Sequence, residues 1–355
     1  MEDELGIQDA FDGQPRGEMG TERLTGNRMG TLALLFVGDV MLGRGVNAAL
    51  REEDADYPWG NTLSVFRSAD LRIANLECVI SDRGSPWPEK EFTFRSDARN
   101  VGVLKAAGID AVSLANNHSL DFGSDALSDT LTMLDQAGIV HAGAGPDLAA
   151  AFTPGTLTAG GLKVALASFT DDRPQWEAGE HRPGIAYVPV DFEEDRATRL
   201  FDTIRAARRA ADIVIVAAHW GPNWGYVPPP RHIPFAHRMI DVGADIVFGH
   251  SGHVFRGIEI YRDRPIMYCA GDFLDDYAVD EDERNDESFI FVVELDGERI
   301  RRLALYPTVI AHCQARMAEH PHAERIAQKM TRLCTQLGTS AQWDKREHRL
   351  KITVV

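Results

Sequence analysis

The amino-acid sequence predicts a layered α/β fold, in which buried strands alternate with helices. Short apolar runs with the length of a buried parallel strand recur along the chain. Segments with helical periodicity lie between several of these runs, and this alternation favours a layered α/β architecture. The expected strands are Thr31–Val37, Leu71–Asn75, Ile109–Leu114, Leu162–Ala167, Ile213–Ala217, Asp245–Phe248 and Ile266–Cys269. The expected helices are Val101–Ala107, Asp125–Ala137, Glu193–Ala210 and Ile233–Val242.

The pattern of the chain changes after Gly271. The runs Ser288–Leu295 and Arg299–Leu305 flank an Asp-Gly dipeptide and predict a hairpin with a tight turn. The spacing of apolar residues over Ala323–Leu337 predicts an amphipathic helix. We therefore expect three parts: a disordered acidic leader at residues 1–28, a main domain at residues 29–310, and a helical extension at residues 311–355 that packs on the core.

Composition argues against several classes of function. The 355 residues carry a formal net charge of −17, and nucleic-acid binding depends on clustered Lys and Arg, so we expect no nucleic-acid partner. The acidic N-terminus lacks the apolar core of a signal peptide, and no later run reaches the roughly 18 apolar residues of a membrane span. The four cysteines show no paired spacing and are expected to be reduced. We expect a cytoplasmic protein without a membrane span, and the sequence leaves its oligomeric state open.

Polar side chains follow six of the apolar runs. Taken singly, each has a structural explanation, such as a helix cap for Asp39. Parallel strands gather their carboxyl ends at one edge of a sheet, so we expect all six clusters to converge. Their nitrogen and oxygen atoms suit a divalent cation or an oxyanion. The clusters are Asp39; Asn75 with Glu77; Asn116, Asn117 and His118 with Asp121; His219; His250 with His253; and Asp272.

Six sequence motifs occur in order between residues 32 and 275. They are GDVMLGR at 38–44, NLECVIS at 75–81, ANNHSLDFG at 115–123, AHWG at 218–221, GHSGHV at 249–254 and YCAGDF at 268–273. Together they resemble the CapA-type family of capsule and poly-γ-glutamate biosynthesis, within the calcineurin-like metallophosphoesterase superfamily. This resemblance implies a four-layer α-β-β-α sandwich, in which mixed sheets are flanked by helices.

The resemblance also implies roles for individual residues. Asp39 matches the first metal-ligand carboxylate of the superfamily, and Glu77 falls at its bridging carboxylate. Asn117 matches a ligand amide, and His118 matches the imidazole that contacts the oxyanion or leaving group. The implied metal ligands are Asp39, Glu77, Asn117, His219, His250 and His253.

The sequence departs from the superfamily pattern at two places. Met41 stands where the first motif usually has a histidine, and Met is a soft, weak ligand for a hard cation. Ser251 and Gly252 stand where capsule-type proteins usually continue a histidine-rich motif, which removes another imidazole. We therefore expect either a divalent metal (Mn, Fe, Zn or Mg) or no metal at all.

Three classes of function fit these residues. The first is a metal-dependent hydrolase that cuts or tailors a peptide or poly-γ-glutamate amide, with His118 as general acid oriented by Asp121. The second is a metal-independent peptide epimerase or isomerase, in which Asp39 or Glu77 faces His253 or His118 across the site. The third is a non-catalytic subunit of a capsule-polymer complex. Metal analysis separates the first class from the others, and substitution of His118 or Asp39 separates either enzyme from the scaffold.

Substrate recognition is expected from irregular loops rich in Pro, Gly and Trp. Trp220 and Trp224 lie in such a loop, and the alternative is that these rings cover one end of the core. Arg44 follows the first expected strand and is the arginine best placed to receive a carboxylate. We also assign Asn75 and Asn116 to substrate binding. The expected partner is a peptide or polyglutamate chain.

Overall fold

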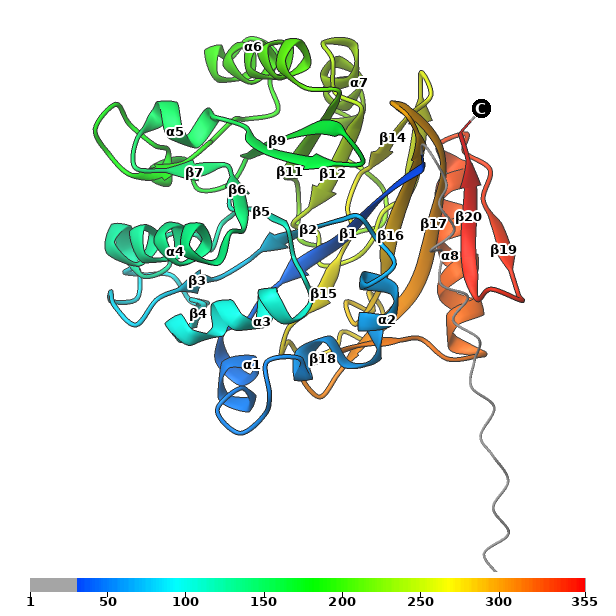
Figure 1. Ribbon diagram of the computed structural model, residues 1–355, viewed down its shortest axis with the longest axis horizontal. Coiled ribbons are helices and arrows are strands. Elements are labelled where there is room, and N and C mark those ends of the chain that lie inside the picture. Colours follow the sequence, from blue (N-terminus) through cyan, green and yellow to red (C-terminus); the bar gives the residue numbers. More distant parts are fainter. Residues whose placement is uncertain (1–30, 355) are drawn as a thin grey trace, which may run out of the picture.

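The computed structural model describes residues 31–354, so the leader expected at residues 1–28 lies outside the described residues. Two β-sheets stack face to face, and helices cover the outer face of each sheet (Figure 1). Helices, two sheets and helices make four layers. The α/β sandwich that the sequence and its resemblance predict is therefore confirmed.

The larger sheet is mixed. It contains β1 (Thr31–Val40), β2 (Leu71–Leu76), β5 (Ala111–Ser113), β6 (Val140–Ala142), β15 (Asp272–Leu274), β16 (Glu287–Asp296), β17 (Arg299–Ala311), β18 (Gln314–Met317), β19 (Gln342–Asp344) and β20 (Arg349–Thr353). The strand order is β19-β20-β17-β16-β1-β2-β5-β6, with β15 beside β1 and β18 beside β17. Strands β1, β2, β5 and β6 run parallel, so their carboxyl ends lie at one edge.

The smaller sheet repeats this plan. It contains β8 (Gly155–Ala159), β9 (Leu162–Thr170), β11 (Ile213–His219), β12 (Ile246–His250), β13 (Ile258–Tyr261) and β14 (Arg264–Met267). The order is β13-β14-β12-β11-β9-β8, in which β9, β11, β12 and β14 are parallel. Two short ribbons complete the strands: β3 (Val79–Ile80) with β4 (Arg95–Ser96), and β7 (Ala144–Gly145) with β10 (Gly184–Ile185).

Eight α-helices lie within residues 31–354. They are α1 (Arg44–Ala49), α2 (Leu63–Phe66), α3 (Val101–Ala106), α4 (Gly123–Ala137), α5 (Leu148–Phe152), α6 (Asp195–Ala210), α7 (His232–Asp241) and α8 (His322–Gln336). Helices α1, α3 and α4 share an apolar core with the larger sheet, and α6 and α7 share another with the smaller sheet. None of the helices in residues 31–354 has the length and apolar character needed to cross a membrane.

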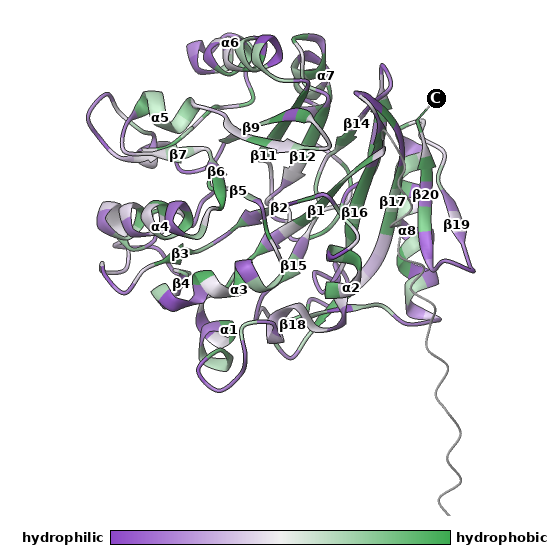
Figure 2. Cartoon of the chain, in the orientation of Figure 1, coloured by the Kyte–Doolittle hydropathy of each residue, from purple (hydrophilic) through white to green (hydrophobic). Residues whose placement is uncertain are grey.

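The central strands are buried on both faces. In β1, Leu34 and Phe36 face the core between the sheets, whereas Leu35 and Val37 face the helices. Alternate residues of a strand point to opposite faces, so a strand covered on both sides needs an unbroken apolar run. The apolar centre of the sandwich is visible in Figure 2, with hydrophilic residues toward the outside.

The C-terminal segment joins both sheets. Helix α8 places Ile326 and Met330 in the core between the sheets, and the same segment adds β18, β19 and β20 to the larger sheet. The boundary that we predict at residue 310 falls inside β17. The predicted hairpin is confirmed: β16 and β17 pair antiparallel up to Asp296 and Arg299.

Two strands extend further than their apolar runs suggest. We expect β11 to stop at Ala217 and β12 at Phe248, but the strands continue to His219 and His250, which pair with each other across the ladder. Backbone pairing therefore continues through the polar residues. This continuation fixes the two imidazoles side by side on rigid strands.

Candidate active site

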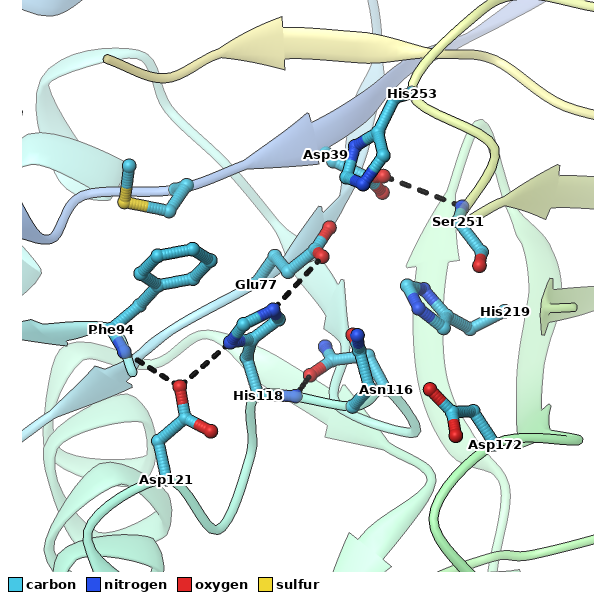
Figure 3. Close-up of polar contacts among 12 residues, drawn as sticks. Asp39, Glu77, Phe94, Asn116, His118, Asp121, Asp172, His219, Ser251 and His253 are labelled. Atoms are coloured by element: carbon cyan, nitrogen blue, oxygen red, sulfur yellow. Dashed lines mark hydrogen bonds and ion pairs between the residues drawn. The ribbon is translucent and has the colours of Figure 1, made fainter. Parts of the chain in front are cut away.

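The predicted polar residues from both sheets meet at the carboxyl ends of the parallel strands (Figure 3). Asp39 of β1 pairs in register with Asn75 of β2, and the Nδ1 atom of His250 lies 3.8 Å from Oδ1 of Asp39. On the other side, Oε1 of Glu77 lies 3.7 Å from Nε2 of His118. The convergence that the motifs predict is therefore present.

His118 and Asp121 form the first imidazole–carboxylate pair. Nδ1 of His118 lies 2.6 Å from Oδ2 of Asp121, and the same oxygen accepts the backbone N–H of Phe94 at 2.6 Å. The Phe94 ring stacks on the imidazole at a centroid distance of 4.0 Å. Burial lowers the pKa of His118 to about 4, against the raising effect of Asp121. His118 is therefore a fixed and neutral imidazole at neutral pH.

Lys90 lies beside the His118–Asp121 pair, and the sequence analysis does not predict its role. Its ammonium group donates to the backbone oxygen of Asn117 at 2.6 Å, lies 2.9 Å from Nδ1 of His118 and pairs with Asp121. Only 5% of its side chain is exposed. Burial lowers the pKa of Lys90, whereas Asp121 acts in the opposite direction. Lys90 comes from an irregular loop without periodicity, so only tertiary packing reveals its role.

His253 and Asp272 form the second imidazole–carboxylate pair. Nδ1 of His253 lies 3.0 Å from Oδ1 of Asp272. Burial alone would lower the pKa of His253, but the charge and hydrogen bond of Asp272, together with Asp39, raise it to about 9. Trp224 and Tyr277 lie beside its ring, each with a centroid distance of 5.5 Å. His253 is therefore protonated at neutral pH.

Two carboxyl groups lie between the imidazole pairs, as Figure 3 shows. The side-chain amide of Asn75 donates to Oδ1 of Asp39 at 2.7 Å and to Oε2 of Glu77 at 3.3 Å. Asn116 in turn donates to Oδ1 of Asn75 at 3.0 Å. Burial, and then the negative charge of Asp39, raise the pKa of Glu77 well above its usual range. This shift favours the neutral form of Glu77, which can donate a hydrogen bond.

The donor atoms present form two groups that share Asp39, and each could hold a cation. Asp39, His219 and His250 each offer a ligand atom within 4.8 Å of the others, as do Asp39, His253 and Asp272. The Nε2 atoms of His219 and His250 and Oδ1 of Asn117 are buried without a partner among residues 31–354. Burial lowers the pKa of both His219 and His250, to about 4 for the latter, so both are neutral, as metal ligands must be. Glu77, the predicted bridging ligand, belongs to neither group.

The two departures from the superfamily pattern have visible consequences. Met41 packs in the core between the larger sheet and its helices, where its sulfur accepts the N–H of Gly43 at 3.0 Å. Ser251 directs its backbone N–H to Oδ2 of Asp39 at 3.3 Å.

One substrate-binding assignment needs correction. Trp220 is fully buried against α7, and its indole N–H donates to the backbone oxygen of Tyr268 at 3.0 Å. The physical reason is the strand alternation, which turns Trp220 to the side opposite His219. Asn75 and Asn116 are fully buried: Asn75 donates to the carboxyl groups of the site and Asn116 donates to Asn75. Their assignment to substrate binding stays a prediction.

Trp224 and its loop lie beside the site, where the sequence predicts substrate recognition. The Trp224 side chain is exposed beside His253. The buried guanidinium of Arg256 donates to the backbone oxygens of Pro222, Trp224 and Gly225 at 2.8, 3.3 and 2.9 Å. A buried cation therefore fixes the backbone of this loop next to the second imidazole pair.

Comparisons with known proteins agree with the motifs. The model of the bacterial capsule synthesis protein family PGA_cap matches residues 33–277. The chain is 33% identical over 350 residues to a Mycobacterium tuberculosis protein named "probable polyglutamine synthesis accessory protein", covering 86% of this chain and 92% of the relative. It is 32% identical over 248 residues to the PGA biosynthesis protein CapA of Bacillus subtilis, covering 69% of this chain and 63% of the relative. The chain therefore belongs to the CapA-type bacterial capsule synthesis family.

Proposed function

We propose that the protein is an acid–base enzyme that moves a proton at a carbon next to a carbonyl group of a peptide, and so epimerises or isomerises one residue. One observation carries the proposal: two imidazole–carboxylate pairs border the same carboxyl groups, and their environments push the two imidazole pKa values in opposite directions. Such a divergence separates a base from an acid within one site.

The neutral His118 is the base in this proposal. Its Nε2 atom takes the proton from the α-carbon, and the electrons of the broken C–H bond move onto the neighbouring carbonyl. Asp121 holds the ring in place and stabilises the imidazolium that forms. The neutral carboxyl group of Glu77, 3.7 Å from Nε2, donates a hydrogen bond to the enolate oxygen.

The protonated His253 is the acid. It returns a proton to the opposite face of the α-carbon, which inverts the configuration without a net gain or loss of atoms. His118 is then protonated and His253 neutral, so both exchange their protons with solvent before the next cycle. The 16% exposure of the His253 side chain gives it contact with water.

Amide hydrolysis is the second candidate function. It is favoured by the donor group of Asp39, His219 and His250 and by the unpartnered nitrogens of the two histidines. A divalent cation held there would lower the pKa of a bound water and polarise a carbonyl group. In this reaction His253 would protonate the leaving amine, and His118 would take a proton from the attacking water.

The names of the relatives guide the choice of substrate. They refer to polyglutamine synthesis and to PGA biosynthesis, so we extend the proposal to glutamate-rich peptides and poly-γ-glutamate chains. One of these names describes an accessory protein, and a non-catalytic role is the outcome if neither reaction is found.

One experiment separates these functions. We expect the purified protein, treated with a chelator, to introduce deuterium at an α-carbon of capped glutamate peptides in D₂O without cleaving them, because proton transfer needs only the two imidazole pairs. Mass spectrometry reports the deuterium, and chiral analysis of the amino acids reports inversion. Cleavage that stops on chelation and returns with added metal would instead support the hydrolase. Neither product, with or without metal, would leave only the accessory role.

A further inference from the structure

The aromatic residues that pack on the two imidazoles also lie beside an arginine, Arg44, at the outer side of the site. Phe94 stacks on His118 and Tyr277 packs edge-on against His253, and the two aromatic rings lie 5.7 Å apart. The guanidinium carbon of Arg44 lies 5.7 Å from the centroid of Phe94 and 5.9 Å from that of Tyr277. One aromatic ring therefore separates Arg44 from each reacting imidazole.

The guanidinium is fixed on one side and open on the other. Its Nε atom lies 3.3 Å from Oδ2 of Asp276, an oxygen that also accepts the backbone N–H of Gly45 at 2.7 Å. The terminal nitrogens Nη1 and Nη2 form no hydrogen bond with any residue in the range 31–354, and 40% of the side chain is exposed. The planar fork of an arginine matches the two oxygens of a carboxylate.

Two further features are found at this arginine. Its backbone has φ = 48°, in the left-handed region that side chains other than glycine rarely adopt, and such strain is common at functional sites. Phe92 lies 6.0 Å from the guanidinium carbon and is 55% exposed, so an apolar surface adjoins the charge.

We propose that Arg44, framed by Phe92, Phe94 and Tyr277, is a carboxylate subsite that holds an acidic peptide next to the reacting imidazoles. The carboxylate is either the side chain of an acidic residue or the C-terminus of the peptide, and both would bind the Nη1–Nη2 edge in the same way. This subsite depends on the proposed function in one respect only: the proposed function identifies His118 and His253 as the reacting residues.

Binding of synthetic peptides tests the subsite. The probes are acetylated oligomers of glutamate and of glutamine, each with a free or an amidated C-terminus, titrated by calorimetry against wild type, R44Q and R44K. We expect the carboxylate-bearing oligomers to bind R44Q about 10- to 100-fold more weakly than wild type, whereas the amidated glutamine oligomer is unaffected. R44K keeps the charge but lacks the fork, so we expect it to lose most of this preference as well.

A control variant and the comparison among the peptides distinguish the remaining interpretations of the binding data. Arg301 lies on the opposite edge of the larger sheet, near the start of β1, and R301Q makes the same change in net charge, so it should bind like wild type.

The peptide series identifies which carboxylate binds. A loss of affinity limited to the amidated glutamate oligomer assigns the subsite to side chains, and a loss limited to the free-acid glutamine oligomer assigns it to the C-terminus. Equal affinities in wild type and R44Q, or no preference of wild type for carboxylates, would overturn the proposal. The assay needs no turnover, so absence of deuterium exchange with intact carboxylate binding refutes the proposed function alone.

Discussion

Replacing His118 by Gln lowers the rate of α-proton exchange by about 10²- to 10⁴-fold, the range that a positioned general base contributes. Glutamine retains a polar side chain of similar length, but it has no nitrogen that can accept a proton. The rate is measured by deuterium incorporation under saturating peptide. His181 is exposed on the surface, so H181Q serves as the matched control and should keep the wild-type rate.

A second variant separates chemistry from folding. Because His118 is buried against Phe94, its loss also affects packing, and thermal unfolding of H118Q must be measured in parallel. We expect H118G, which leaves space for a free imidazole, to regain part of the exchange rate when imidazole is added. An H118Q variant that retains more than about a tenth of the wild-type rate would remove His118 from the role of base.

Replacing Lys90 by Met lowers the free energy of unfolding by about 3–5 kcal/mol, as expected when one partner of a buried ion pair is removed. The carboxylate of Asp121 is fully buried, and K90M leaves it without its cation. The backbone oxygen of Asn117 also loses a donor. Denaturant unfolding measures the change.

The control variants for this prediction isolate the buried charge. Lys163 is exposed, so K163M should change the stability by no more than about 0.5 kcal/mol. The double variant K90M/D121N removes the unpaired charge and should regain part of the lost stability. A K90M variant within about 1 kcal/mol of wild type would show that the ion pair contributes little to folding.

Much of the fold and the convergence of the site follow from local sequence patterns. Unbroken apolar runs identify the central strands, and the parallel order brings their polar ends together. The sequence alone therefore predicts that Asp39, His118 and His250 lie close to one another. The alternation of a strand also explains the error at Trp220, since a residue next to an inward-facing His219 must face the other side.

Other parts of the site depend on tertiary contacts that no local pattern encodes. Lys90 lies in a loop, and its role follows only from the approach of that loop to the Asn117–Asp121 turn. The charge of His253 likewise depends on Asp272, which the fold brings to it from β15. The opposite protonation of the two imidazoles is therefore a property of the folded chain.

The protonation states of the two imidazoles test the central claim most directly. Long-range ¹⁵N–¹H correlation spectra report the charge and tautomer of each histidine, and spectra of H118Q and H253Q assign the two signals. At neutral pH we predict a neutral His118, which becomes charged only as the pH falls toward about 4, and a charged His253, which loses its proton only as the pH rises toward about 9. Two imidazoles that are both neutral or both charged at pH 7, titrating together, would contradict the assignment of a base and an acid to this site.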